Sequence, residues 1–485
     1  MPDLVLGVDL GTSGVGVVAQ DAQGRVHARA DTPLRLETPR PGWTQQDPDA
    51  WREAAEASLA HVCAEVGGER VGAIGVSGQM HGMVARDAAG AALHPALLWN
   101  DQRTAAEVDE IHAAVGRSRL IERTGNPAVT GFQLPKVLWL RRHAPEAFAR
   151  TTRIMLPKDD LALHLCGEAA AEPCDASGTG AYHLASGRWD EEVLAALDLD
   201  PGLWPRLVRS DEVVGGLRGE LATRLGLSAD VPIVAGAGDN AAAATGLALG
   251  SAHAEVGSVS LGTSGVLQVP VARPTPDPEG RVHLFAHADG AYLLLGVTLA
   301  AAGSLRWYRD TFAPTQGYDA LVAAAASAPV GANGVTFKPY LAGERTPHMR
   351  ADLRGSFTGL SLATGAGDVI RAVLEGVACS LRDALDVMAP LSRPERLLAT
   401  GGGADSDVWL QILADVLGLP LGRPTDAAGA PLEVGPAEGA AWLAWRALGV
   451  APERAPQAER WFEPDPPTRA ASEALLESYR SVPLG

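Results

Sequence analysis

Lysine is almost absent from this sequence of 485 residues, which contains only Lys136, Lys158 and Lys338. The formal net charge is −18, and no block rich in lysine and arginine offsets it. Nucleic acids and anionic membranes attract proteins through clustered positive charge, so we expect neither as a partner. A P-loop is excluded as well, because it needs a lysine directly after its Gly-rich turn and none stands there.

Cysteines and long apolar runs are also scarce. The four cysteines (Cys63, Cys166, Cys174 and Cys379) form no C-x-x-C pair, which indicates reduced thiols and no metal cluster. The most apolar stretch, Ala291–Ala302, is shorter than the ~20 residues that cross a bilayer. The first residues lack the basic and apolar regions of a signal peptide. We therefore expect a soluble, cytoplasmic protein.

What the chain does contain is an internal repeat. Leu-Gly-Thr-Ser-Gly-Val occurs at Leu10–Val15 and again at Leu261–Val266, each time after an alternating apolar stretch. With 46 % apolar and 20 % charged residues, the chain is globular and long enough for several domains. We predict two related α/β domains, residues 1–249 and 250–485, each opening with a strand and a Gly-rich turn.

The repeat is expected to form a β-hairpin in each domain. The stretch Gly14–Ala19 resembles a dinucleotide fingerprint, but it leads to a turn at Asp21–Gly24 and a further strand, whereas the fingerprint must open a helix. Backbone N–H groups and hydroxyls of such hairpins can cradle phosphate oxygens. Two of them could grip one triphosphate across a cleft, and the alternative is a pair of plain tight turns. The candidate phosphate-binding residues are Thr12, Ser13, Gly14, Thr263 and Ser264.

The two copies differ in the residue that precedes them. Asp9 stands before the first copy and Ser260 before the second. One carboxylate beside phosphates is what a hydrated Mg²⁺ needs, so Asp9 is the candidate metal residue. The alternative is a carboxylate that caps the turn.

Polar residues follow predicted strands at two places in the first half. Ser77–Gly82 comes directly after the strand Val71–Val76, and there Gln79 and His81 could bind sugar hydroxyls while Met80 packs on the carbon skeleton. In Trp99-Asn-Asp-Gln-Arg103, Trp99 could stack on a sugar face, and Asp101 and Arg103 could hydrogen-bond sugar hydroxyls. The alternatives are a structural histidine and an Asp101–Arg103 pair that braces a loop.

Two Gly-rich segments complete the candidate site. Asp239 and Asn240 follow the strand Val231–Gly238, where Asp239 could accept a proton from an attacking hydroxyl or could merely cap the helix that follows. Thr400–Asp407 lies between a strand and a helix, and its glycines would let an adenosine ring approach the backbone. The alternative there is a helix cap after a flexible turn.

Taken together, these motifs resemble the FGGY family of carbohydrate kinases. The resemblance runs from about Leu4 to Leu448, and the family's second signature region is intact in Gly355–Leu360 through Asp368–Glu375. Its first region, Gly131–Trp139, has Gln133 where a small residue is usual. The Ser77–Gly82 element is most characteristic of the family members that act on xylulose.

The resemblance implies two actin-like (ribonuclease H-like) domains with ATP and sugar in the cleft between them. It implies ATP-dependent phosphorylation of D-xylulose at O5, with Mg²⁺ required and a homodimer compatible. By motif, the sugar would meet Met80, His81 and the base Asp239, and the Mg²⁺–ATP would meet Asp9, Thr12, Ser13, Thr263, Gly402, Gly403 and Asp407. Asp407 stands where family members carry Asn. The rival interpretations are another ketose, a polyol or an aldonate as substrate, or an actin-like sugar- or nucleotide-binding protein or ATPase without sugar transfer.

Overall fold

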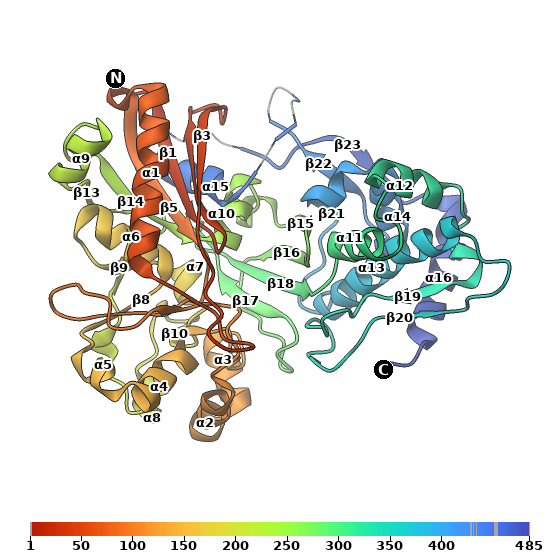
Figure 1. Cartoon of the computed structure of the whole chain (residues 1–485), viewed down its shortest axis with the longest axis horizontal. Helices are drawn as coiled ribbons and strands as arrows, with labels where there is room; N and C mark the ends of the chain where they lie inside the picture. The colour runs from red at the N-terminus through yellow and green to blue at the C-terminus, as the bar shows by residue number, and fades with distance from the viewer. Residues whose placement is uncertain (1, 427–428, 430, 433, 451–453, 485) are drawn as a thin grey trace.

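The structure is a computed structural model that describes residues 2–426, 429, 431–432, 434–450 and 454–484. It contains two large β-sheets, one from each half of the chain, with helices around both (Figure 1). Within the described residues, no helix is both long and apolar enough to span a membrane.

The first sheet has six strands in the order β13-β14-β5-β1-β2-β3. Strand β1 lies inside the sheet, where it pairs in parallel with β5 and antiparallel with β2. Its apolar residues Leu4, Leu6, Val8 and Leu10 are all fully buried, as expected for an interior strand. The strands are β1 (Leu4–Leu10), β2 (Gly14–Gln20), β3 (Val26–Pro33), β5 (Val71–Gly78), β13 (Val213–Gly216) and β14 (Pro232–Gly238).

Helices cover both faces of this sheet. The helices α1 (Pro48–Val66), α6 (Pro157–Cys166) and α9 (Gly219–Leu225) lie on one face, and α10 (Asp239–Gly246) and α15 (Pro436–Ala447) lie on the other. The helix α15 comes from the second half of the chain, yet it packs against β1 and β5 of the first sheet (Figure 1).

Glycines make this close packing of α15 possible. A Cβ added at Gly7 would lie 1.8 Å from the carbonyl oxygen of Ala437, and one at Gly75 would lie 2.0 Å from that of Ala440. Such contacts exclude any side chain, so the helix backbone rests directly on the strands. The expected domain boundary between residues 249 and 250 stays a prediction. The helix α15 follows that boundary in the sequence but packs on the sheet of the first domain.

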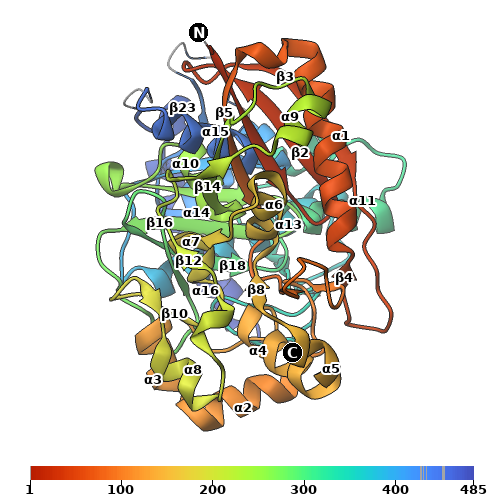
Figure 2. The same cartoon turned by 90° about the vertical axis from the view of Figure 1, so that its left-hand side faces the viewer.

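A smaller region of helices and two-stranded sheets extends from the first domain (Figures 1 and 2). Its helices are α2 (Ala105–Val115), α3 (Arg117–Thr124), α4 (Gln133–His143), α5 (Pro145–Arg150), α7 (Pro173–Ala176) and α8 (Glu191–Ala196). Its strands are β4 (Gln45–Gln46), β6 (Val84–Arg86), β7 (Ala96–Leu97), β8 (Arg153–Met155), β9 (Ala170–Ala171), β10 (Tyr182–His183), β11 (Arg188–Trp189) and β12 (Arg206–Leu207).

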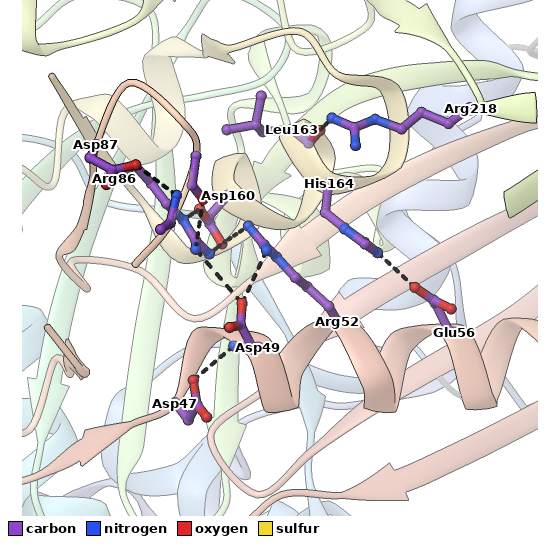
Figure 3. Close-up of polar contacts among 12 residues, drawn as sticks. Asp47, Asp49, Arg52, Glu56, Arg86, Asp87, Asp160, Leu163, His164 and Arg218 are labelled. Atoms are coloured by element: carbon purple, nitrogen blue, oxygen red, sulfur yellow. Dashed lines mark hydrogen bonds and ion pairs between the residues drawn. The ribbon is translucent and has the colours of Figure 1, made fainter. Parts of the chain in front are cut away.

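A buried ion cluster fixes α6 against α1 and β6. Arg86 donates two hydrogen bonds to the carboxylate of Asp160, at 2.7 and 2.6 Å, and both side chains are inaccessible to solvent (Figure 3). Arg52 of α1 approaches the same carboxylate at 3.6 Å and donates to Asp49 at 3.0 Å. Loss of Arg86 would leave the buried Asp160 carboxylate with only Arg52 nearby, so this cluster ties α6 to α1 and β6.

The second sheet has the order β17-β18-β16-β15-β21-β22-β23. Its strands are β15 (Val256–Leu261), β16 (Gly265–Val271), β17 (His283–Ala286), β18 (Tyr292–Thr298), β21 (Arg396–Thr400), β22 (Leu421–Pro424) and β23 (Ala458–Phe462). Around it lie α11 (Ala302–Phe312), α12 (Tyr318–Ala326), α13 (Ala366–Met388), α14 (Asp407–Leu417), α16 (Arg469–Ser481) and the small sheet of β19 (Thr336–Lys338) and β20 (Ser356–Thr358).

Both copies of the repeated hexapeptide form the predicted hairpins. β1 pairs with β2 through Leu10 and Val15, and β15 pairs with β16 through Leu261 and Gly265. The predicted strands before Ser77 and before Thr400 are present, and all four cysteines are free thiols. The α/β fold class is therefore confirmed.

Candidate active site

Strand register brings three polar residues to one edge of the first sheet. Asp9 on β1 is the parallel partner of Ser77 on β5, and Ser77 in turn pairs with Ala237, two residues before Asp239. Ligands bind at the carboxyl ends of parallel strands in α/β sheets. The predicted metal residue, sugar element and base therefore meet at one edge.

Asp239 is the first residue of α10, and Gly238 occupies the N-cap position. The N-cap interpretation of Asp239 is therefore wrong, although its Oδ1 accepts the backbone N–H of Asn240 at 2.7 Å and the side-chain amide at 2.9 Å. Burial raises the pKa of Asp239 to about 6, and the two hydrogen bonds oppose this rise. Such a carboxylate is ionised at neutral pH and basic enough to take a proton.

Asp9 lies close enough to Asp239 for their charges to interact. Burial, and then repulsion by Asp239, raises the pKa of Asp9 to about 7. Its Oδ1 is buried and has no hydrogen-bond partner among the described residues. A carboxylate oxygen that is orphaned in this way fits a site for a hydrated Mg²⁺, which would supply the missing partner.

Met80 and His81 follow β5 directly, and Met80 contacts Asn240, the residue after Asp239. The imidazole Nδ1 lies 2.7 Å from the carbonyl oxygen of Gly178, and burial lowers the pKa of His81 to about 3. The ring is therefore neutral, with Nδ1–H donating and Nε2 left as an acceptor for a hydroxyl. Met80 is buried, and the side-chain amide of Asn240 reaches its sulfur at 3.7 Å.

Gln79 and Trp99 are tied to the first hairpin. Thr12 Oγ1 donates to Gln79 Oε1 at 2.9 Å, and Trp99 Nε1 donates to Thr12 Oγ1 at 3.0 Å. Gln79 Nε2 donates to Gln46 at 3.2 Å, so both ends of its amide are engaged within the protein. These bonds connect the Ser77–Gly82 segment, predicted to bind the sugar, directly to the first hairpin.

Asp101 and Arg103 brace a loop, which was the structural one of the two interpretations of this pair. Asp101 accepts the backbone N–H of Thr44 at 2.7 Å and Arg103 Nε at 2.8 Å. The Arg103 guanidinium lies 4.1 Å from the ring centre of Trp43, and both charged side chains are buried.

The second hairpin opens onto a cavity of about 760 Å³. The cavity is lined by the hairpin residues Gly262 and Thr263, by the predicted Gly402, Gly403 and Asp407, and by an apolar wall from α12 that includes Tyr318, Val322 and Ala323. A cavity of this size, with one apolar wall and backbone glycines, suits a purine nucleoside. Among the described residues that line it, none comes from the first hairpin, so Thr12, Ser13 and Gly14 lie outside it.

Sequence reasoning missed one cation in this cavity and did not foresee the partners of Asp407. Arg306 of α11 lines the cavity and donates to Thr263 Oγ1 at 2.9 Å. The signal was available in the sequence, because Arg306 lies in the first turns of a helix (Ala302–Phe312) that follows directly after the strand Tyr292–Thr298. Asp407 is bonded to Arg423 and to Arg460, and its hydrogen bond with Arg423 is the main cause of its lowered pKa.

The two sheets are joined through α10. Gln268 of β16 donates to the backbone and side-chain oxygens of Asn240, each at 3.2 Å. A hydrophobic cluster connects α10 and α15 with Leu293, Leu295 and Leu398 of the second sheet. The residue after the predicted base is thus in direct contact with the second domain.

Comparisons with known proteins agree with this geometry. Residues 4–246 match the N-terminal domain and residues 257–448 the C-terminal domain of the FGGY family of carbohydrate kinases. The chain is 40 % identical over 488 residues to a xylulose kinase of Escherichia coli K12, covering 99 % of this chain and 98 % of that protein. A xylulose kinase of Lactococcus lactis is 37 % identical over 490 residues, covering 99 % and 96 %.

Solved structures lead to the same family. The crystal structure of a xyloylose kinase from Brucella ovis superposes with a TM-score of 0.91 at 36 % identity, covering 99 % of this chain and 98 % of that one. The expected architecture of two actin-like domains is confirmed by these neighbours and by the two sheets described above. The chain belongs to the FGGY family of carbohydrate kinases.

Proposed function

We propose that this chain transfers the γ-phosphate of ATP to D-xylulose and releases D-xylulose 5-phosphate and ADP. The observation that supports the proposal is that Asp239, Met80 and His81 follow the carboxyl ends of neighbouring strands of the first sheet, next to the first hairpin. Relatives at 34–40 % identity that are named xylulose kinases support the choice of sugar. The distinction from a nucleotide-binding protein without transfer rests on Asp239, because a sensor needs no base there.

Asp239 is the proposed general base. As the O5 hydroxyl attacks, its proton passes to the Asp239 carboxylate, the O5–Pγ bond forms, and the bond from Pγ to the bridging oxygen of ADP breaks. The raised pKa of about 6 places this carboxylate near the optimum for a base at neutral pH. Phosphoryl transfer depends mostly on positioning and on electrostatics, so the site must also orient the hydroxyl.

Orientation of the sugar is assigned to the residues around Asp239. The free Nε2 of neutral His81 accepts a sugar hydroxyl, and Met80 and Trp99 provide apolar surface. Asn240 contacts both Asp239 and Met80, so it holds the base against the sugar pocket. Gln79 acts through Thr12, since its amide is engaged within the protein.

The phosphates are assigned to the hairpins and the adenosine to the cavity. Thr12, Ser13 and Gly14 would face the triphosphate from the first domain, and Thr263 and Ser264 from the second. Gly402, Gly403 and Asp407 would line the adenosine site, beside Tyr318. Mg²⁺ would be held near Asp9, where it neutralises charge on the phosphate oxygens.

Closure of the two domains would bring the halves of this site together. The nucleotide cavity belongs to the second domain and the sugar residues to the first, and Asn240 and Gln268 connect them. We therefore propose residues 1–249 and 250–485 as the two moving units, except that α15 (Pro436–Ala447) would move with the first because it packs on the first sheet. We also propose that the enzyme works in the cytoplasm and forms a homodimer.

A coupled ADP-release assay tests this function. D-xylulose should give the highest kcat/KM in a panel of ketoses, polyols and aldonates, and ³¹P NMR should place the phosphate on O5. A clear preference for glycerol or gluconate would reject the sugar, while sugar-independent ADP release alone would reject the kinase assignment.

A further inference from the structure

All three lysines of this protein are buried. Lys136 and Lys158 are inaccessible to solvent and Lys338 is 3 % exposed. Lysine is almost never fully buried unless its charge is paired, because removing an ammonium group from water is costly. Each of the three therefore needs a local explanation.

Two of the lysines have an electrostatic partner. Lys158 Nζ lies 2.5 Å from the carboxylate of Asp159 and 3.3 Å from that of Glu172. Lys338 Nζ lies 3.6 Å from the ring centre of Tyr479, within cation–π range. Both arrangements compensate a buried ammonium group in an ordinary way.

Lys136 has no such partner. Its Nζ donates to the carbonyl oxygen of His81 at 2.9 Å and to that of Gly131, and both acceptors belong to the backbone. Within the part of the chain that the structure describes, no carboxylate forms an ion pair with it. The charge of Asp101 also acts on Lys136, but Asp101 is itself paired with Arg103. Burial accordingly lowers the pKa of Lys136 to about 7.

The first carbonyl that Lys136 binds belongs to a strained residue. His81 has a backbone φ of 69°, in the left-handed region that residues other than glycine rarely occupy. Such a conformation persists only where the surroundings enforce it. The ring is fixed by Gly178 and by stacking on Phe132 at 4.6 Å, but the backbone oxygen is fixed by Lys136.

The second carbonyl belongs to the loop beside the other sugar-facing segment. A Cβ added at Gly131 would lie 2.5 Å from the carbonyl oxygen of Trp99, so this loop rests directly on the Trp99 backbone. Lys136 therefore joins the turn that carries His81 to the loop that supports Trp99. Both are segments to which the proposed function assigns sugar contacts.

We propose that Lys136 is a positioning residue for the sugar: its buried ammonium group holds the His81 turn in its left-handed conformation and sets its distance from the Gly131 loop. This inference rests on the proposed sugar contact of His81. It assigns no contact between Lys136 and the sugar or the nucleotide.

Lys136→Met tests the proposal, since methionine fills a similar volume without N–H donors. We expect KM for D-xylulose to rise by roughly 10- to 100-fold, because a displaced His81 would leave its buried hydrogen bond to the sugar unmade, and such a loss weakens binding by about this factor. KM for ATP and kcat should stay within about twofold of the unchanged enzyme. The matched control is Lys338→Met, which removes a buried lysine from the small β19–β20 sheet and should lower the melting temperature without changing KM for the sugar.

The link through His81 is tested by the double variant. If Lys136 acts on the sugar through His81, the variant with both His81→Ala and Lys136→Met should have a KM for D-xylulose within about twofold of that of His81→Ala alone. Multiplied effects of the two substitutions would overturn the proposal. An unchanged sugar KM in Lys136→Met, or equal rises in the KM for sugar and for ATP, would overturn it too.

The two single variants distinguish a failure of the role proposed for Lys136 from a failure of the sugar contact proposed for His81. If His81→Ala leaves the sugar KM unchanged, the sugar contact assigned to His81 fails, and the role of Lys136 fails with it. If His81→Ala raises the KM and Lys136→Met does not, only the role of Lys136 fails. Should Lys136→Met not fold, Lys136→Gln keeps N–H donors at shorter reach and should show a smaller rise in sugar KM, and no rise would again overturn the proposal.

Discussion

Replacing Asp239 by asparagine separates catalysis from structure at the proposed base. Asparagine keeps the Oδ1 that accepts the two hydrogen bonds from Asn240 at 2.7 and 2.9 Å, and it keeps the shape of the side chain. It removes only the ability to take a proton. General-base catalysis typically contributes ~10²–10⁴-fold, so we expect kcat to fall by roughly 10²-fold or more while sugar and ATP affinities change little.

The same substitution should not destabilise the protein. Since the pKa of Asp239 is raised from 3.8 to about 6, the native state holds its proton more tightly than the unfolded chain does. The free energy of unfolding therefore falls as the pH rises from about 4 to about 6. Above that range, and so at neutral pH, the decrease is complete. The difference in the free energy of unfolding corresponds to at most ~3 kcal/mol, and it is smaller because Asp239 is only partly buried and solvent screens its charge. Asp239→Asn removes this loss, so its melting temperature at pH 7.5 should equal or exceed that of the unchanged protein.

The assay combines turnover by coupled ADP release with thermal unfolding of the same preparations. A large loss of kcat with an equal or higher melting temperature supports Asp239 as a general base whose partly buried charge lowers the stability of the protein. Near-normal kcat in Asp239→Asn would remove the base from the mechanism. A loss of kcat accompanied by a lower melting temperature would show that the carboxylate serves the fold.

Four further results are expected. His81→Ala should raise KM for D-xylulose by roughly 10-fold and leave ATP affinity unchanged, whereas equal weakening of ATP binding would make His81 structural. Asp9→Asn should raise the Mg²⁺ concentration needed for half-maximal turnover, with partial rescue by excess Mg²⁺, and an unchanged requirement would favour a turn cap. The kcat/KM for the sugar should fall below a pH of about 6 as Asp239 becomes protonated, and a flat profile there would contradict the base. Arg86→Met should cost ~3 kcal/mol in urea unfolding because it removes both hydrogen bonds of the buried Asp160 carboxylate and leaves only Arg52, at 3.6 Å, as a cationic neighbour. Arg70→Met, from an exposed pair, should be nearly silent.

The hairpins and the edge of the first sheet could be predicted from the sequence because their determinants are local. Alternating apolar residues with Gly-rich turns specify a strand pair, and the repeat of six residues shows that the arrangement occurs twice. Asp239 was predicted at the end of a buried strand, and the register of β14 with β5 then places it beside the Ser77–Gly82 element. The period of the apolar residues and the residue types in the turns are enough to predict such hairpins and strand ends.

Contacts between distant segments could not be predicted in this way. The packing of α15 on β1 depends on Gly7 meeting Ala437 across 430 positions of the chain, and no local pattern encodes it. Gln79 has the chemistry of a sugar ligand, yet its amide is engaged by Thr12 and Gln46. The burial of Lys136 was also invisible, since a lysine in a helix is normally a surface residue.

The most direct measurement is a crystal structure of the protein with D-xylulose, Mg²⁺ and a non-hydrolysable ATP analogue. We predict that Thr12 and Thr263 both contact the triphosphate and that adenosine fills the cavity beside Gly402 and Gly403. The O5 hydroxyl should lie within ~2.6–3.2 Å of the Asp239 carboxylate. A sugar bound with O5 away from Asp239, or a triphosphate that contacts only one hairpin, would contradict it.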